Sequence, residues 1–245
     1  MTRLDRFLVD AGHFPSRERA RAAIEAGLVK VGGVVALKPA TKAGPDHDVE
    51  VCGDVHPYVS RGGVKLEAAL SAFDIDPAGL LCLDLGASTG GFCDVFLRRD
   101  AQKIYAVDVG SGQLHPSLRD DPRIINLEKT HAKDLSSALI PEPVSLIVCD
   151  VSFISLKKAL PAALALGGSG AMLAALVKPQ FEVGRTQIGR GGIVKPSHEN
   201  SAGVAEDIAN WLSDDQGWAP LGYIESPVTG GDGNKEYLIG ARKTT

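Results

Sequence analysis

Two lysines and two acids stand at positions from which they could act together on one reacting group. Asp150 and Lys178 each follow a short apolar run (SLIVC and AMLAALV), and Glu236 precedes another (YLIGA). Lys65 falls in the first turn of an expected helix, two residues after a glycine pair. Ammonium and carboxylate groups that converge on one sheet edge can orient an oxygen nucleophile and move its proton.

Each of these residues also has an ordinary structural explanation. A lysine at a strand end is commonly a surface side chain with a solvated head. An aspartate there is commonly a helix cap or a turn former, and Glu236 could be a solvated edge residue. Convergence of all four beside a nucleotide-type turn favours a site over these separate explanations.

The stretch LDLGASTGGF, residues 83–92, passes from an apolar strand through a turn of small residues into a helix. Its G-x-x-x-G-G spacing differs from the G-x-G-x-x-G of dinucleotide-binding proteins. Asp84 at the strand end would disfavour a pyrophosphate and favour an ammonium or sulfonium group. Asp108 follows the next strand, about 20 residues on, where an acid can bond ribose hydroxyls.

These features favour S-adenosylmethionine over NAD as the cofactor, with an NAD-linked oxidoreductase as the alternative. The residues predicted to contact the cofactor are Asp84, Gly86, Ala87, Ser88, Thr89, Gly90, Gly91, Phe92, Asp108 and Asp150.

The lysine–acid cluster suits methyl transfer to a hydroxyl group. A sulfonium methyl is already activated, so the protein has to align it with an oxygen nucleophile. A lysine ordinarily titrates near pH 10.4, and a second ammonium or partial desolvation lowers that value. We predict that Lys178 is the base or steers the oxygen, and that Asp150 contacts both this lysine and the methyl donor. Lys65 and Glu236 would tune and position them, and the choice of which lysine loses the proton stays open.

Alternating strands and helices must position these residues. We expect strands at 81–85, 103–107, 123–127, 145–149, 171–177, 220–226 and 236–241, with helices between most of them. This alternation predicts an α/β fold with a Rossmann-like, mostly parallel sheet, whose ligands lie at the carboxyl ends of the strands. The Gly-Gly-Asp-Gly-Asn run at 230–234 marks a hairpin that makes the last strand antiparallel.

The first 55 residues form a separate small α+β unit in this interpretation. Thr2 is placed to cap a first helix, and Ser16 caps a second helix that Gly27 ends. A strand–turn–strand unit (LVKVGGVVALKP) follows, closed by residues 48–51. Up to residue 45 there are eight Lys and Arg against four Asp and Glu, a net charge of +4, whereas the whole chain carries −4. Charge alone leaves a solvated helix face as an alternative to a nucleic-acid surface.

The pattern RLDRFLVDAG-x-x-x-SRERARAAIEAGLVKVGG resembles the S4 RNA-binding domain. This resemblance implies that the basic helix faces grip structured RNA. It divides the chain into an S4-like domain (1–55), a linker (56–60) and a methyltransferase domain (61–245). A glycine-rich loop, VGRTQIGRGGIVKP, is a second candidate RNA contact, with an ordinary surface loop as the alternative. The predicted RNA-binding residues are Arg3, Arg6, Arg17, Arg21, Arg185 and Arg190.

Across the whole chain, the motifs DLGASTGGF, DVSFISL, LVKPQFEVGR, GRGGIVKP and GNKEYL resemble the TlyA (haemolysin A-like) family of ribosomal RNA methyltransferases. The catalytic domain of that family is similar to FtsJ-type 2′-O-methyltransferases, which have a Lys-Asp-Lys-Glu tetrad. The resemblance places the tetrad on Lys65, Asp150, Lys178 and Glu236. It implies 2′-O-methylation of cytidine in ribosomal RNA or ribosomal subunits with S-adenosylmethionine. One departure is His131, which stands where an asparagine is expected.

Composition limits the other possibilities. The N-terminus has no signal-peptide pattern, and the longest apolar run, 160–177, is broken by proline and glycines, so no membrane span is expected. Four cysteines without a C-x-x-C pair predict reduced thiols in a cytoplasmic protein and no metal site. A membrane-active haemolysin and a catalytically inactive RNA-binding factor remain as alternative functions, and the oligomeric state is left open.

Overall fold

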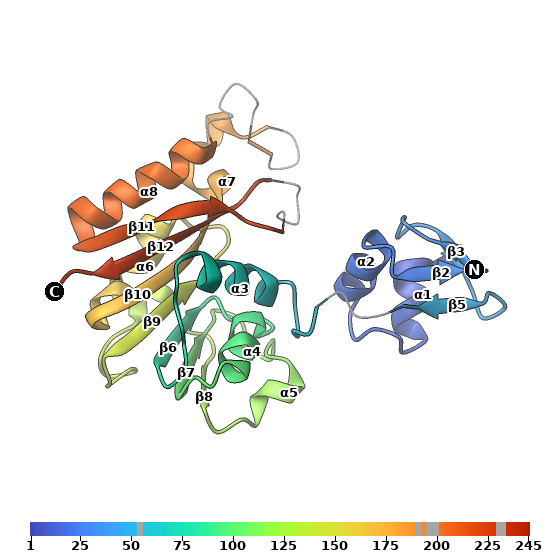
Figure 1. The fold of residues 1–245 in the computed structure, drawn as a ribbon, viewed down its shortest axis with the longest axis horizontal. Helices are drawn as coiled ribbons and strands as arrows, with labels where there is room; N and C mark the ends of the chain where they lie inside the picture. The colour runs from blue at the N-terminus through green and yellow to red at the C-terminus, as the bar shows by residue number, and fades with distance from the viewer. Residues whose placement is uncertain (53–55, 190–192, 195–200, 229–233) are drawn as a thin grey trace. The chain divides into compact units, whose positions relative to one another are not determined.

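A computed structural model describes residues 1–52, 56–189, 193–194, 201–228 and 234–245 (Figure 1). The chain divides into two compact units, an N-terminal unit of Met1–Pro57 and a C-terminal unit of Tyr58–Thr245.

The N-terminal unit consists of two short helices and small antiparallel sheets. Its apolar core gathers Leu4 and Leu8 of the first helix, Ala23 and Ile24 of the second, and Val29 of the sheet. The elements are β1 (Thr2–Arg3), α1 (Leu4–Asp10), α2 (Arg17–Glu25), β2 (Val29–Val31), β3 (Val34–Val35), β4 (Lys42–Ala43) and β5 (Val49–Val51).

The ends of the two helices test the predicted caps. Thr2 does not cap α1, because it pairs with Ala43 in the β1–β4 ladder and Arg3 occupies the N-cap position. Ser16 caps α2 as predicted, its hydroxyl accepting a hydrogen bond from the Arg19 amide at 3.3 Å. Gly27 follows the end of α2 with a positive φ of 73°, the conformation that ends helices at glycine.

The predicted strand–turn–strand unit is confirmed. β2 and β3 pair antiparallel through Val31 and Val34, and the two residues between them, Gly32 and Gly33, both have positive φ. That conformation is typical of a tight hairpin turn that favours glycine at both positions. β5 then adds to the other edge of β2, as expected for residues 48–51.

The C-terminal unit is built on a seven-stranded sheet in the order β11-β12-β10-β9-β6-β7-β8. The strands are β6 (Leu81–Leu85), β7 (Lys103–Val107), β8 (Ile124–Leu127), β9 (Val144–Cys149), β10 (Gly167–Val177), β11 (Trp218–Glu225) and β12 (Tyr237–Lys243). The helices are α3 (Gly62–Ala72), α4 (Gly91–Arg98), α5 (Pro116–Arg119), α6 (Leu156–Ala165), α7 (Pro179–Glu182) and α8 (Ser201–Gln216), with single turns η1 (Ala132–Asp134) and η2 (Arg185–Gln187).

All seven predicted strands are present, with ends shifted by four residues or fewer. The pairs β6–β7, β7–β8, β6–β9 and β9–β10 are parallel, and β12 is antiparallel to both of its neighbours. The mostly parallel sheet with an antiparallel last strand is therefore confirmed. The turn expected at 230–234 falls, up to residue 233, outside the described residues.

Apolar side chains alternate between the two faces of the sheet, as a strand period of two requires. Leu83, Leu85 and Cys149 belong to a core that α6 and α8 cover. Cys82 and Val148 belong to the opposite core, which α3, α4 and α5 cover (Figure 1). Three of the four cysteines are buried and all four are free thiols.

Candidate functional site

The four lysines and acids of the predicted tetrad form two ion pairs. Lys178 Nζ forms an ion pair with Asp150 Oδ1 at 2.5 Å and donates a hydrogen bond to Ser152 Oγ at 3.0 Å. Lys65 Nζ donates to Glu236 Oε2 at 2.5 Å. Both lysine side chains are nearly buried, with 10% and 11% exposed. A carboxylate partner for each ammonium offsets the cost of removing that charge from water.

Strand register brings the two pairs to one edge of the sheet. β12 begins at Tyr237, which is paired with Val177 at the end of β10. The next position on each strand carries Glu236 and Lys178, which therefore adjoin. Asp150 follows the end of β9, the other neighbour of β10, on the same edge. The arrangement can hold an oxygen nucleophile and, with one lysine deprotonated, accept its proton.

Beside Asp150, a cavity of about 660 Å³ opens at the carboxyl ends of β6, β7 and β9. Because β7 and β9 flank β6 on opposite sides, this is the topological switch point at which such sheets bind ligands. Its volume is typical of a small-molecule site. The lining residues are Leu85, Gly86, Ser88, Val107, Asp108, Val109, Gln113, Thr130, His131, Ala132, Lys133, Asp150, Val151, Ser152, Phe153, Ile154, Lys158 and Ala159.

The glycine turn borders this cavity mainly through its backbone, which lies close to the backbone of Asp150. Gly86 has a φ of 89°, and a Cβ there would lie 2.6 Å from the carbonyl oxygen of Asp150. Three backbone amides of the turn form hydrogen bonds inside the protein. Those of Gly86 and Ala87 donate to the Val107 carbonyl, and that of Ser88 donates to Asp108 Oδ2 at 2.8 Å.

Asp108 lines the cavity and is already held in place by the backbone. Its Oδ2 accepts the Ser88 amide, and its Oδ1 accepts the Gly110 amide at 2.7 Å. A carboxylate has about four acceptor positions, so capacity remains for ribose hydroxyls.

Asp84 does not line the cavity. Strand alternation turns its side chain toward α4, where it accepts a hydrogen bond from Cys93 Sγ at 3.1 Å with 1% of the residue exposed. Burial, reinforced by the nearby charges of Asp150 and Asp108, raises the pKa of this carboxyl to about 7. The Asp84 carboxyl therefore faces the core and not the cavity, and its predicted direct contact with a cationic ligand stays a prediction.

Other residues of the predicted cofactor set also lie away from the cavity walls. Ala87 and Phe92 pack into the apolar core on the α4 side of the sheet. A Cβ on Gly90 would meet Leu118, and Gly91 approaches Ser60. Of the predicted set, four residues line the cavity and six do not: the six are Asp84, Ala87, Thr89, Gly90, Gly91 and Phe92.

Several cavity residues escaped the sequence reasoning. Gln113 lies on the wall beside Ser88, whose hydroxyl is 3.2 Å from its side-chain oxygen. Lys133 and Lys158 add positive charge to the wall. Ser152, the hydrogen-bond partner of Lys178, could have been predicted from the sequence, because it stands only two residues after Asp150.

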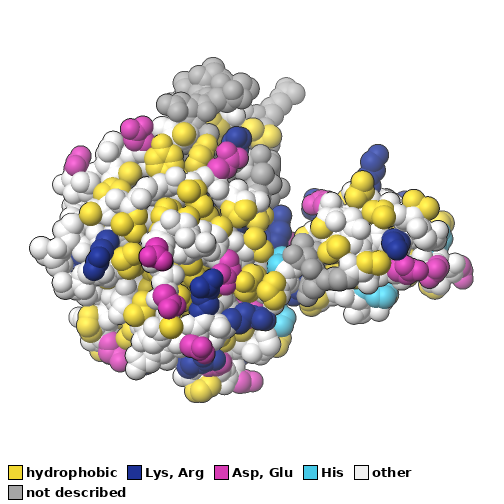
Figure 2. Space-filling view, viewed as in Figure 1, with side chains coloured by type: hydrophobic (Ala, Val, Ile, Leu, Met, Phe, Trp, Pro, Cys, Tyr) yellow, Lys and Arg dark blue, Asp and Glu magenta, His cyan; other side chains and the backbone are white. Residues whose placement is uncertain are grey.

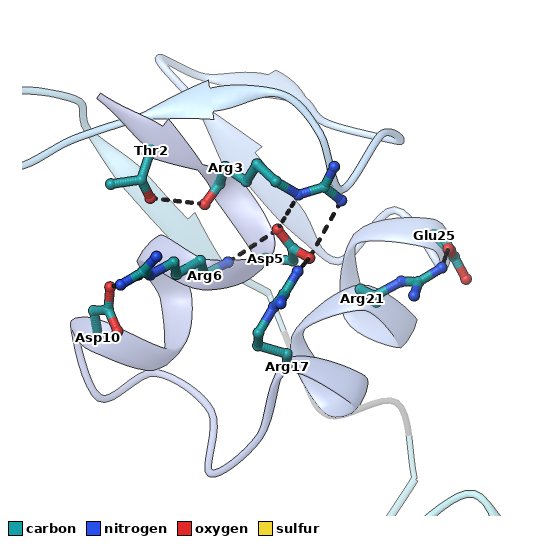
Figure 3. A network of polar contacts seen from close by, with 8 residues as sticks. All are labelled: Thr2, Arg3, Asp5, Arg6, Asp10, Arg17, Arg21 and Glu25. Carbon is teal, nitrogen blue, oxygen red and sulfur yellow. Dashed lines mark hydrogen bonds and ion pairs between the residues drawn. The ribbon is translucent and has the colours of Figure 1, made fainter.

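In the N-terminal unit, the predicted RNA-binding arginines are exposed but paired with acids (Figure 3). Arg3 and Arg17 both bond Asp5, and Arg6 pairs with Asp10 at 3.5 Å. A further pair, Arg21 with Glu25, is wider at 3.9 Å. The four arginine side chains keep 46% to 68% of their surface exposed.

The two remaining arginines of the RNA set are in the glycine-rich loop. Arg185 begins η2, and Arg190 lies outside the described residues.

Basic and acidic side chains are interspersed on the face seen in Figure 2. Within the described part of the chain, no helix is long and apolar enough to cross a membrane. The same residues include no group of three His, Cys, Asp or Glu arranged to hold a metal ion.

Comparison with known proteins identifies the families that the two units match. Residues 58–243 match the FtsJ-like methyltransferase family, and residues 2–49 match the S4 domain. The chain is 43% identical to the Mycobacterium tuberculosis protein named 16S/23S rRNA (cytidine-2′-O)-methyltransferase TlyA, over 99% of this chain and 90% of that protein. It is 38% identical to Hemolysin A of Brachyspira hyodysenteriae, over 96% of this chain and 98% of that one.

Solved structures agree with the sequence comparisons. A putative hemolysin from Streptococcus thermophilus has a TM-score of 0.77 at 40% identity, covering 99% of this chain and 88% of its own. The magnesium protoporphyrin IX methyltransferase of Synechocystis shares the fold alone, with a TM-score of 0.51 at 15% identity, over 75% of this chain and 82% of that one.

The sheet order, the cavity at the switch point and the match over residues 58–243 define the class as a methyltransferase of the FtsJ-like type. With an S4 domain before it and a relative 43% identical over nearly the full length, the chain belongs to the TlyA family.

Proposed function

We propose that this protein transfers a methyl group from S-adenosylmethionine to the 2′-hydroxyl of cytidine in ribosomal RNA. The observation that carries the proposal is the pair of buried lysine–carboxylate ion pairs beside the switch-point cavity. The relative from Mycobacterium tuberculosis is named for this reaction on 16S and 23S rRNA.

The cavity suits the cofactor in size and charge. Asp108 would hold the ribose hydroxyls. The wall carries both signs of charge, so Asp150 would suit the cationic groups of the cofactor and Lys133 and Lys158 its carboxylate. Gly86, which has no Cβ, lets the turn lie against the Asp150 backbone at the wall of the cavity. Thr130, His131 and Ala132 line the same cavity and are placed to border the remaining part of the cofactor. When bound, S-adenosylmethionine supplies an activated methyl group on a sulfonium centre.

In this proposal Lys178 prepares the nucleophile. Its Nζ, held by Asp150 and Ser152, contacts the 2′-oxygen and takes the hydroxyl proton when the amine is neutral. Lys65, fixed by Glu236, would help to position the ribose at the same edge of the sheet. Because an ammonium cannot accept a proton, only the deprotonated fraction of Lys178 is competent as a base.

The N-terminal unit would deliver the RNA. Arg3, Arg6, Arg17 and Arg21 project exposed guanidinium groups, which suit phosphate oxygens. Arg185 and Arg190 would add contacts from the glycine-rich loop. A ribosomal RNA substrate is in keeping with a cytoplasmic location.

The proposal is tested with purified small and large ribosomal subunits, bare ribosomal RNA and S-adenosylmethionine labelled with tritium on its methyl group. We expect label in RNA from at least one subunit, recovered as 2′-O-methylcytidine after digestion. Bound cofactor without label in any RNA would instead support a catalytically inactive RNA-binding factor.

The name of the Brachyspira relative makes membrane lysis a second function to test. Release of dye from liposomes by this protein, equal for wild type and Lys178→Ala, would support a membrane activity separate from methyl transfer. We expect no release at protein concentrations that methylate RNA.

A further inference from the structure

A buried carboxylate in the N-terminal unit organises two of its exposed arginines (Figure 3). Asp5 lies in the first turn of α1, and its side chain has no exposed surface. Its Oδ1 accepts hydrogen bonds from Arg3 Nε and from the Arg6 backbone amide, each at 3.0 Å. Its Oδ2 accepts from Arg17 at 2.7 Å and from a second Arg3 nitrogen at 3.3 Å.

The other acid–arginine pairs of these helices are of a different kind. Asp10 and Glu25 each lie one helical turn from their arginine, at 3.5 Å and 3.9 Å, and are more than half exposed. Such surface pairs hold a side chain weakly. Asp5 instead joins residues from β1 and α2 through one buried group, so both guanidinium groups lie against the same carboxylate.

We propose that Asp5 is a positioning residue that presents Arg3 and Arg17 side by side to phosphate groups of the RNA backbone. The inference rests on the proposed ribosomal RNA substrate. A guanidinium has five N–H donors. Asp5 occupies two donors of Arg3 and one of Arg17, so both keep donors that can bond phosphate oxygens.

Asp5 would strengthen RNA binding by holding the two arginine side chains in place, and not by its own charge. A long arginine side chain loses rotamer freedom when it binds, and a side chain already held in place loses less. Asp5 itself carries a negative charge, because the bonds from Arg3 and Arg17 outweigh the opposing effect of burial and hold its pKa at about 2. Charge counting alone would therefore make Asp5 unfavourable for RNA binding.

The positioning role and the charge count predict opposite changes in RNA affinity for Asp5→Asn. This substitution removes one negative charge and keeps the shape of the side chain. If positioning dominates, the full-length variant binds purified ribosomal subunits about tenfold more weakly than wild type, the loss of one charge-assisted contact. Asp10→Asn is the matched control, with the same charge change on the same helix at an exposed pair. It should bind as tightly as wild type or slightly tighter.

A second comparison separates positioning from damage to the fold. In an Arg3→Ala, Arg17→Ala background, Asp5→Asn should cause no further loss of binding, because the groups that it positions are absent. A further loss there, or binding by Asp5→Asn at least as tight as wild type, would overturn the inference.

The proposed function fails in a distinguishable way. If wild type neither binds the subunits nor methylates their RNA, the ribosomal substrate is wrong and the role of Asp5 falls with it. If wild type binds and methylates, and only the Asp5 comparison fails, the substrate stands and the positioning role alone is refuted.

Discussion

At the scale of single residues, the strand ends hold carboxylates in two different settings: Asp150 and Glu236 pair with lysines at the edge of the sheet, whereas Asp84 is buried against α4. Asp150, Lys178 and Glu236 adjoin apolar runs, so their meeting at one edge followed from a parallel sheet with an antiparallel last strand. Asp84 faces the core instead, because a residue one position from the strand end points to the opposite face. Gln113 gave no signal, since its place on the cavity depends on how the loop after β7 folds.

The burial of Asp84 predicts an unusual pH dependence of stability. Its pKa is raised to about 7 in the folded state, against 3.8 for an unperturbed group. The folded state therefore binds this proton more tightly than the unfolded state. The stabilising contribution is complete below pH 3.8 and is lost as the pH rises toward 7, at up to about 1.4 kcal/mol per pH unit.

Urea unfolding of wild type and Asp84→Asn at several pH values from 4.5 to 8 measures this contribution. We expect the free energy of unfolding of wild type to fall relative to that of Asp84→Asn as the pH rises through this range. A constant difference between the two proteins would show that the carboxyl does not titrate there.

At the scale of elements, strands and strong turns were predictable and weak pairings were not. The seven strands of the large sheet and the glycine hairpin of the N-terminal unit have clear patterns of apolar residues and turn residues. The β1–β4 pair joins two strands of two residues each, too short for any periodicity, and its pairing displaced Thr2 from its expected cap.

The turn after β6 gives a prediction at this scale. Gly86→Ala places a methyl group 2.6 Å from the Asp150 carbonyl oxygen at a φ of 89°, so the backbones of the turn and of Asp150, which both line the cavity, have to move apart. We expect cofactor affinity, measured by calorimetry, to fall at least about tenfold, a loss of about 1.4 kcal/mol.

Gly79→Ala is the matched control, because Gly79 also has a positive φ, of 69°, but no atom within 4 Å of a Cβ. We expect Gly79→Ala to lower the free energy of unfolding by about 1 kcal/mol, because alanine is strained at a positive φ, and to leave cofactor affinity unchanged. Equal affinities for both variants would mean that the close approach at Gly86 does not shape the cavity.

At the scale of the whole molecule, positive charge is concentrated in the first 45 residues, while four acids at 46–54 bring the N-terminal unit Met1–Pro57 to a net charge of zero. The chain has a net charge of −4, yet residues 1–45 carry +4. The sign of the whole chain therefore does not describe the surface proposed to meet RNA. The motifs of both units, in the order S4 then FtsJ-like, were recognisable from the sequence, and the family matches confirm them.

The concentration of arginines in the first 45 residues predicts where the salt dependence of RNA binding originates. Replacing Arg3, Arg6, Arg17 and Arg21 together by alanine should reduce the slope of log affinity against log salt by about 3, at 0.7 to 0.9 for each phosphate contact. Cofactor affinity should not change, because the cavity belongs to the C-terminal unit. An unchanged salt slope with weaker binding would show that these arginines act on the fold and not on phosphates.

The most direct measurement compares wild type with Lys178→Ala by mass spectrometry of nucleosides from ribosomal RNA treated with each protein. We predict 2′-O-methylcytidine with wild type and a rate lower by about 10² to 10⁴ with Lys178→Ala, at unchanged cofactor affinity. Lys157→Ala, an exposed lysine of α6, is the control and should match wild type. Methylation on a base, or wild-type activity of Lys178→Ala, would contradict the account.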